Sequence, residues 1–78
     1  MKEEIIPSGF TLRSYTKAEL ALLYSPHNAP RTAIRKFNSW LRHSPRLWEP
    51  LRESGVSIAT REYNPMQVQM IVNYLGAP

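Results

Sequence analysis

The sequence predicts a mainly α-helical fold, a small helical bundle with one short extended or β element. Apolar residues recur at helical spacing in several segments, and prolines or glycines separate those segments. A chain of 78 residues has room for one modest hydrophobic core. We therefore treat residues 1–78 as a single domain and residues 1–12 as a candidate extended or flexible N-terminal arm.

The N-terminal part of the chain predicts an extended segment followed by a helix. Residues 5–15 contain apolar residues that alternate with polar ones, and Gly9 supplies a turn. Thr16 has the features of a helix N-cap, and Glu19, three residues later, completes a capping box. Pro26 cannot extend a helix, so we expect this helix to end just before it.

The second predicted helix, residues 30–43, has the clearest pattern in the sequence. Pro30 suits the first position of a helix, where its missing N–H removes no hydrogen bond. One face carries apolar residues with a period near 3.6, namely Ala33, Ile34, Phe37, Trp40 and Leu41. We expect this face, including its tryptophan, to pack into the core.

Two further helices are predicted, with an ambiguous segment between them. Ser44 is a candidate N-cap for the third helix, and Gly55 is a natural C-terminal stop. Residues 56–63 are either a short strand or an extended arm. Asn64 opens the last helix, residues 65–75, whose apolar stripe consists of Val68, Ile71, Val72 and Leu75.

Charge is distributed unevenly along the chain. The net charge is +4, and the six acids stand at positions 3, 4, 19, 49, 53 and 62. The stretch from 20 to 48 contains no acid, but it contains the basic residues Arg31, Arg35, Lys36, Arg42 and Arg46. Such a block creates a local positive field to which polyanions respond, although surface solubility explains the same charge.

The second helix concentrates this charge on one side. Four of its residues, Arg31, Arg35, Asn38 and Arg42, are spaced at i, i+4, i+7 and i+11, which forms a narrow stripe opposite the apolar face. Arginine pairs bidentately with guanine and asparagine with adenine, while other basic side chains neutralise phosphates. The predicted partner is therefore double-stranded DNA, bound by Arg31, Thr32, Arg35, Lys36, Asn38, Ser39, Arg42, Arg46 and Arg61. An ordinary solvated helix face would show the same polarity.

The first two helices predict a helix-turn-helix-like unit, in which the second helix enters a DNA groove. Residues 15–21 (Tyr-Thr-x-x-Glu-Leu-Ala) and 31–35 (Arg-Thr-x-Ile-Arg) resemble the opening of MerR-type and excisionase-type winged-helix regulators. This resemblance implies a winged-helix-like fold with residues 56–63 as the wing and Arg61 as a phosphate contact. The connecting segment, residues 22–31, is longer than that family's turn.

A second pattern spans most of the chain. It comprises Tyr15, Glu19-Leu20-Ala21, Trp40, Leu47, Leu51 and Gly55, and it closes with Tyr63-x-Pro65-x-Gln67-Val68, Ile71-Val72, Leu75-Gly76 and Pro78. Over residues 13–78 this pattern resembles a family of short bacterial proteins known only as a domain of unknown function. Ala77 departs from the glutamate that this family often has before its last proline. The resemblance implies a bacterial protein in a cytoplasmic setting and supplies no activity.

Catalytic chemistry has little support in the sequence. Aspartate is absent, and neither His27 nor His43 has a second metal ligand at a useful spacing. The three glycines are far apart and form no phosphate-binding loop. We therefore predict a non-enzyme without a cofactor or a metal. No apolar run approaches the roughly 20 residues that a membrane helix needs, so we predict no membrane association.

The last predicted helix offers an alternative interaction surface. No charged side chain follows Glu62, so the outer side of residues 65–75 is uncharged, and it includes Met66, Met70 and Tyr74. Surfaces depleted of charge and rich in methionine and aromatic residues are typical of interface cores. The alternative function is a small adaptor that binds a second copy or another protein. A second layer of core packing on the same side would leave no such surface.

Overall fold

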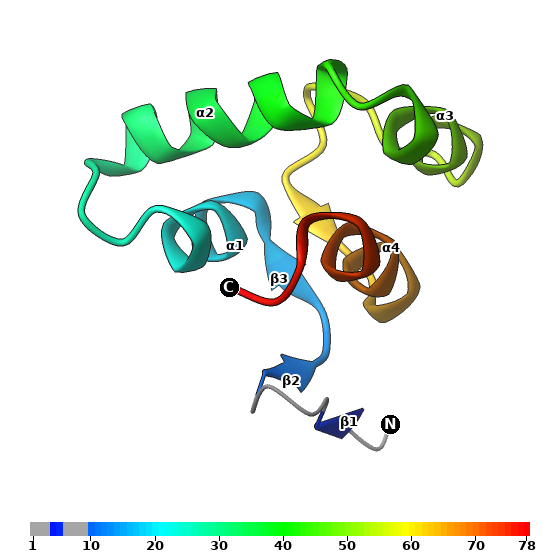
Figure 1. Cartoon of the computed structure of the whole chain (residues 1–78), viewed down its shortest axis with the longest axis horizontal. Coiled ribbons are helices and arrows are strands. Elements are labelled where there is room, and N and C mark those ends of the chain that lie inside the picture. The colour runs from blue at the N-terminus through cyan, green and yellow to red at the C-terminus, as the bar shows by residue number, and fades with distance from the viewer. Residues whose placement is uncertain (1–3, 6–9) are drawn as a thin grey trace.

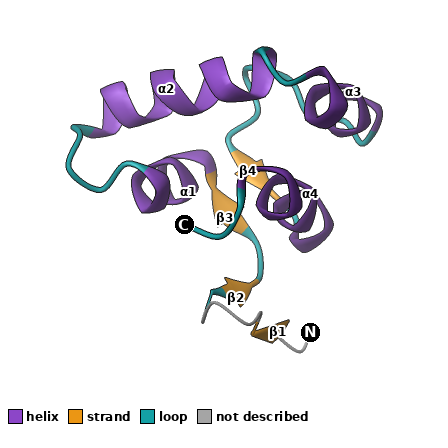
Figure 2. Cartoon of the chain, viewed as in Figure 1, coloured by secondary structure: helices purple, strands orange, loops and turns teal. Residues whose placement is uncertain are grey.

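The computed structural model describes residues 4–5 and 10–78, and within them the chain forms four helices and four two-residue strands. In chain order these are β1 (Glu4–Ile5), β2 (Thr11–Leu12), β3 (Tyr15–Thr16), α1 (Lys17–Tyr24), α2 (Pro30–Arg42), α3 (Pro45–Glu53), β4 (Glu62–Tyr63) and α4 (Pro65–Leu75). Helix α2 lies across the top of the molecule, above α1 and α4 (Figure 1, Figure 2). The predicted mainly helical fold with a short β element is confirmed.

The strands form two small antiparallel pairs. β1 pairs with β2, and β3 pairs with β4 so that Tyr15 lies opposite Tyr63. All three N-terminal strands lie in or at the edge of the segment predicted to be extended, residues 5–15. The predicted turn at Gly9 and part of the predicted arm, residues 1–12, lie outside the described residues.

Helix α1 begins with the predicted capping box. The Glu19 N–H donates to Thr16 Oγ1 over 3.1 Å, and the Thr16 N–H donates to Glu19 Oε1 over 2.8 Å. The hydrogen bond from the Thr16 N–H stabilises the carboxylate and lowers the pKa of Glu19 below its usual range. The helix ends at Tyr24, ahead of Pro26, as predicted.

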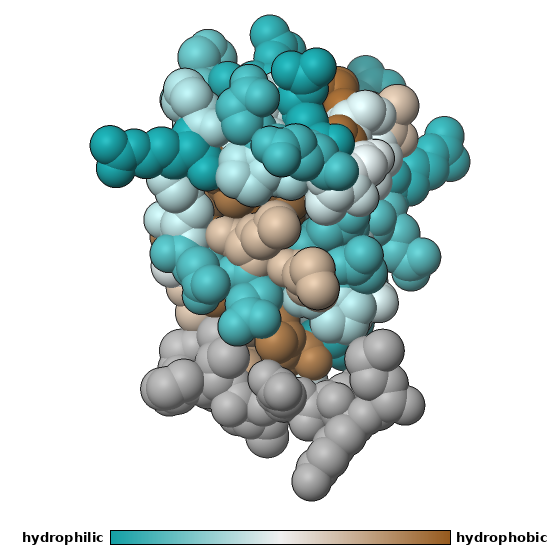
Figure 3. All heavy atoms as spheres, turned by 90° about the vertical axis from the view of Figure 1, so that its right-hand side faces the viewer, coloured by the Kyte–Doolittle hydropathy of each residue, from teal (hydrophilic) through white to brown (hydrophobic). Residues whose placement is uncertain are grey.

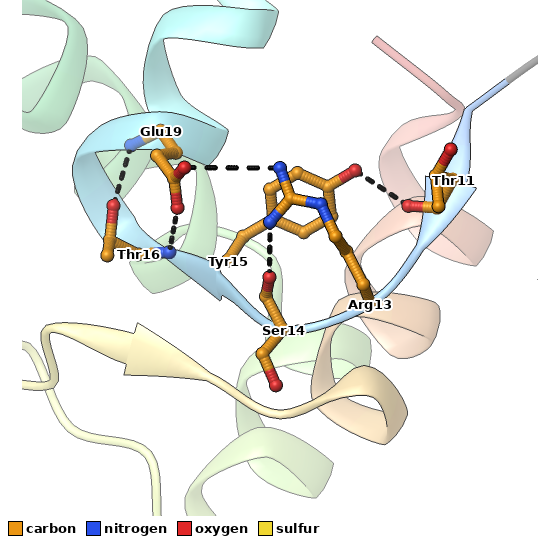
Figure 4. Close-up of polar contacts among 6 residues, drawn as sticks. All are labelled: Thr11, Arg13, Ser14, Tyr15, Thr16 and Glu19. Carbon is orange, nitrogen blue, oxygen red and sulfur yellow. Dashed lines mark hydrogen bonds and ion pairs between the residues drawn. The ribbon is translucent and has the colours of Figure 1, made fainter. Parts of the chain in front are cut away.

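The corner between β2 and β3 is held by Arg13 and Tyr15 (Figure 4). The Arg13 guanidinium lies over the Tyr15 ring, 3.7 Å from its centroid. Arg13 Nη1 donates to the Ser14 carbonyl over 2.6 Å, and Nη2 lies 3.9 Å from Glu19 Oε2. The Tyr15 hydroxyl donates to the Thr11 carbonyl over 2.6 Å. The charge of Arg13 is therefore engaged by local partners.

Helix α2 matches the predicted helix 30–43 to within one residue. Its apolar face is buried at Ala33, Phe37 and Leu41. Trp40 lies at the edge of this face, 36% exposed, with its ring in a T-shaped contact with Phe37. The prediction that Trp40 packs into the core therefore holds for only part of its side chain. In Figure 1, α1 is seen nearly end-on and α2 from the side, so the two helices cross steeply.

The beginning of α3 differs from the prediction. The Ser44 side chain does not cap this helix, because its hydroxyl donates to the Trp40 carbonyl over 2.7 Å. Ser44 thus satisfies a free carbonyl at the end of α2 instead of a free N–H at the start of α3. The end of α3 is as predicted, since Gly55 follows it with φ 105°, a left-handed conformation that favours glycine.

Helix α4 begins with a second capping box and is tied to the end of α3. The Asn64 N–H donates to Gln67 Oε1 over 3.0 Å, and the Gln67 N–H donates to Asn64 Oδ1 over 2.8 Å. Gln67 Nε2 also donates to the carbonyl and hydroxyl oxygens of Ser54, over 3.2 and 3.1 Å. One side chain therefore fixes both the start of α4 and its position against α3.

Residues 56–63 are mostly a loop. The Ser57 N–H donates to Thr60 Oγ1 over 2.8 Å, and the Thr60 N–H donates to the Ser57 carbonyl over 3.1 Å, which closes a tight turn. A strand forms only at Glu62–Tyr63, and its partner is β3. In the described part of the chain, this segment forms no hairpin of its own, so the proposed wing has no strand pair within it.

The core lies between the four helices and β4. Its largest fully buried side chains are Tyr63, Phe37, Leu20, Leu41, Leu51, Ile71 and Val68. The Tyr63 hydroxyl has no hydrogen-bond partner among the described residues, and burial raises the pKa of Tyr63. A buried hydroxyl without a partner is destabilising, so the packing of the Tyr63 ring has to compensate for it.

Candidate nucleic-acid interface

The predicted arginine stripe lies along one side of α2. Arg31, Arg35 and Arg42 are exposed and line an open hollow of about 340 Å³. The complete lining is Arg31, Ile34, Arg35, Asn38, Ser39, Arg42, His43 and Ile58. The structure thus brings five of the nine predicted DNA-binding residues onto one concave surface.

The loop before β4 forms the facing wall. A second hollow of about 710 Å³ is lined by Thr16, Lys17, Ala18, Ile34, Asn38, Ile58, Ala59, Thr60 and Arg61. Ile34, Asn38 and Ile58 line both hollows, so the two adjoin. We call the combined surface the arginine groove. It consists of Arg31, Arg35 and Arg42 on α2, Arg61 in the loop, and Ile34 and Ile58 where the hollows meet.

The arginine groove has an unbalanced positive charge. Among the described residues, no carboxylate lines either hollow. The ion pairs within the same residues join Arg13 to Glu19 and Arg52 to Glu49, and none of these four lines the first hollow or the second. The guanidinium groups of the groove are therefore available to an anionic ligand.

Lys17 holds the two walls together, and the sequence gave no indication of it. Its side chain is 6% exposed, and its ammonium donates to Asn38 Oδ1 over 2.8 Å and to the Ile58 carbonyl over 2.6 Å. Its backbone N–H donates to the Arg61 carbonyl over 2.7 Å. Burial lowers the pKa of Lys17. Lysine is rarely buried, and these partners are distant in sequence, so no local pattern reveals this contact.

Asn38 has a structural contact in addition to its predicted position on the groove. It is half-buried, and its amide oxygen accepts the hydrogen bond from the Lys17 ammonium. Bidentate pairing with adenine uses both the oxygen and the nitrogen of an asparagine amide. In Asn38 one of these two atoms is already engaged, which leaves the arginines as the residues best placed to contact bases.

Three predicted residues lie outside the groove. Thr32 and Lys36 are on α2 but line neither hollow. Arg46, near the start of α3, lines a separate cleft of about 260 Å³ together with Leu47, Pro50, Met70, Asn73 and Tyr74. The structure therefore places Arg46 on the surface that was predicted for the alternative function.

The three residues of that alternative surface have different environments. Met66 is 68% exposed and Tyr74 is 47% exposed, whereas Met70 packs against the hydrophobic core. Figure 3 shows the corresponding side of the molecule, to the right in Figure 1, where apolar patches lie among hydrophilic side chains. The competing expectation of further core packing thus applies to Met70 and leaves Met66 and Tyr74 as surface residues.

Other kinds of site were also considered. Among the described residues, no group of three or more histidine, cysteine, aspartate or glutamate side chains is placed to hold a metal ion. His43 Nδ1 lies 2.8 Å from the Ser39 carbonyl, a contact within the end of α2. No helix in the described part of the chain is long and apolar enough to cross a membrane.

Comparison with known families decides the broader of the two resemblances. The model of the family described as Domain of unknown function (DUF4248) matches residues 11–78. The chain belongs to this family. The matched range of the DUF4248 domain includes every helix and both walls of the arginine groove. No curated protein and no solved structure matches the chain.

Proposed function

We propose that this DUF4248 domain is a non-catalytic module that binds double-stranded DNA through the arginine groove, in a cytoplasmic setting. The observation that supports this proposal is the convergence of four arginines, from α2 and from the loop before β4, on two adjoining hollows. Among the described residues, the lining of these hollows contains no carboxylate. A polyanion of regular spacing is the ligand that such a surface favours.

Backbone phosphates are the first contacts that the groove would make. Duplex DNA carries one negative charge for about every 1.7 Å of its axis, so several phosphates lie within the span of α2. Each arginine that neutralises a phosphate releases condensed counterions and adds to the affinity. Arg61, on the wall opposite α2, is well placed for such a contact while α2 lies against the duplex.

Base edges are the second class of contact. Helix α2 has 13 residues and is therefore about 20 Å long, and the major groove of B-DNA, about 12 Å wide, admits an α-helix. Arg31, Arg35 and Arg42 offer paired donors that fit guanine. The steep crossing of α1 and α2 in Figure 1 supports a helix-turn-helix arrangement, in which α2 would be the recognition helix.

The test is a fluorescence anisotropy titration of labelled mixed-sequence duplex DNA at several salt concentrations. We expect the logarithm of the affinity to fall with the logarithm of the salt concentration, with a slope of about −0.9 for each phosphate neutralised. Arg35→Ala and Arg42→Ala should each weaken binding. Arg61→Ala should make the slope less steep by about one contact.

Arg52→Ala is the matched control. Arg52 is exposed on α3, pairs with Glu49 over 3.9 Å and lines neither hollow, so its removal changes the net charge equally without changing the groove. If Arg52→Ala weakened binding as much as Arg35→Ala, the attraction would be a general effect of net charge. Absence of binding by the wild-type protein at low salt would refute the proposal.

A second candidate function is self-association through the face formed by α3 and α4. It is favoured by the cleft between these helices, which Met70 and Tyr74 line, and by the exposure of Met66 beside it. Sedimentation velocity over a wide concentration range tests this function. A dimer that Met66→Lys and Tyr74→Lys dissociate would support it, and a monomer at every concentration would exclude it. These variants are cleaner than a change at Met70, which also packs against the core.

A further inference from the structure

An apolar side chain lies in the middle of the arginine groove. Ile58 is 39% exposed, and it lines both hollows, one of which also contains Arg31, Arg35 and Arg42. Ile34 on α2 is half-buried and lines both hollows as well. The groove therefore combines guanidinium groups with a short apolar strip, and phosphate binding alone gives no reason for such a strip.

The position of Ile58 is fixed by its backbone. The Ile58 carbonyl accepts from the buried Lys17 ammonium over 2.6 Å, and the Arg61 carbonyl accepts from the Lys17 N–H over 2.7 Å. Between these anchors, the turn from Ser57 to Thr60 is closed by its own hydrogen bonds. Because both ends of this short loop are attached to one residue of α1, Ile58 is presented to the groove by a constrained backbone.

The base edges of the major groove supply a matching apolar group. Adenine, guanine and cytosine present hydrogen-bond donors and acceptors there, and thymine adds a C5-methyl group that apolar side chains contact. We propose that Ile58, together with Ile34, contacts thymine methyl groups while the neighbouring arginines contact guanines and phosphates. Lys17 acts as the positioning residue for this contact. This inference rests on the proposed function and adds a sequence preference to it.

The experiment compares two duplexes that differ only in this methyl group. One is an A·T-rich duplex with guanines at its ends, and the other has deoxyuridine in place of every thymine, which leaves all hydrogen-bonding groups unchanged. We expect the wild-type protein to bind the thymine duplex about fourfold more tightly for each methyl group buried, the equivalent of one buried methylene. Melting curves verify that both duplexes are double-stranded under the conditions of the titration.

Three variants connect the preference to the residues. Ile58→Ala, a change at an exposed position, should bring the affinity ratio of the two duplexes close to one. Arg35→Ala should weaken binding to both duplexes by the same factor and keep the ratio. Lys17→Met, which releases the Ile58 carbonyl, should reduce the ratio as Ile58→Ala does, and circular dichroism verifies that it folds.

The outcomes separate this inference from the function on which it rests. Equal affinity of the wild-type protein for both duplexes would overturn the methyl contact and leave DNA binding intact. A preference for thymine that persists in Ile58→Ala would also overturn the assignment to Ile58. Absence of binding to either duplex would overturn the proposed function and this inference together.

Discussion

The arginine groove and the face formed by α3 and α4 both expose apolar side chains, but they do so in different electrostatic surroundings. In the groove, Ile58 lies among arginines and its loop is anchored by Lys17. On the other face, Met66 and Tyr74 belong to a helix without charged residues, and Arg46 is the one charged residue in the lining of the nearby cleft. Exposed hydrophobicity alone therefore does not identify an interface, because the charge around it determines which kind of partner it suits.

Charge reversal in the groove should give the largest difference between the two regions. Arg35→Glu combined with Arg42→Glu should weaken DNA binding by about 30-fold or more, since each arginine contact contributes about 1–3 kcal/mol. Met66→Gln combined with Tyr74→Gln should leave the affinity unchanged. Anisotropy titrations measure both pairs, and melting temperatures establish that the exposed substitutions leave the fold intact. Equal losses in the two pairs would remove the distinction between the regions.

Loss of the side chain that braces each region should have a smaller and more specific effect. Lys17→Met should weaken DNA binding by about tenfold, because a hydrogen bond to a charged group contributes about 1.5 kcal/mol or more. It should also speed hydrogen exchange of the Thr60 amide. Gln67→Ala, which removes the contact between α4 and Ser54, should lower stability by about 1–2 kcal/mol and leave DNA binding unchanged. Slow exchange at Thr60 in Lys17→Met would contradict the bracing role.

The core that the two regions share should respond differently at two tyrosines. The Tyr24 hydroxyl donates to the Gly76 carbonyl, and burial raises the pKa of Tyr24 to about 12. Tyr24→Phe should therefore lower the free energy of unfolding by about 1 kcal/mol. The Tyr63 hydroxyl has no partner within the described chain, so Tyr63→Phe should be neutral or stabilising. Urea denaturation measures both, and a larger loss for Tyr63→Phe would indicate a partner for its hydroxyl.

The smallest expected effect is a pH dependence at the start of α1. The capping box lowers the pKa of Glu19 in the folded state, so its contribution is fully present above the unfolded pKa, about 4.3, and is lost as pH falls through the folded value. The melting temperature of the wild-type protein should therefore fall more steeply below that pH than the melting temperature of Glu19→Gln. Identical pH profiles would mean that the carboxylate charge contributes nothing to this cap.

The sequence allowed the helices to be predicted because their signals are local. Thr16 with Glu19 and proline at the start of α2 are patterns of a few residues, and hydrogen bonds within the same few residues produce the structure. The arginine stripe was predictable for the same reason, since helical spacing alone aligns Arg31, Arg35 and Arg42.

The remaining features depend on contacts between distant parts of the chain. Lys17 is buried because Asn38 and Ile58 accept its hydrogen bonds, and neither partner is near it in sequence. Arg46 lies on the α3–α4 face because of the orientation of α3, which the charge count between the acids does not reveal. The Ser44 hydroxyl bonds backwards to α2, a choice between two local partners that its residue type does not decide.

The pairing of β3 with β4 has a consequence for synthesis of the protein. Tyr15 and Tyr63 lie opposite each other, although three helices separate them along the chain, so this contact closes a long loop and forms late. During translation, α1 and α2 leave the ribosome before the segment that contains Arg61. A nascent chain therefore carries the arginines of α2 on a single wall and acquires the facing wall only after residue 63 has emerged.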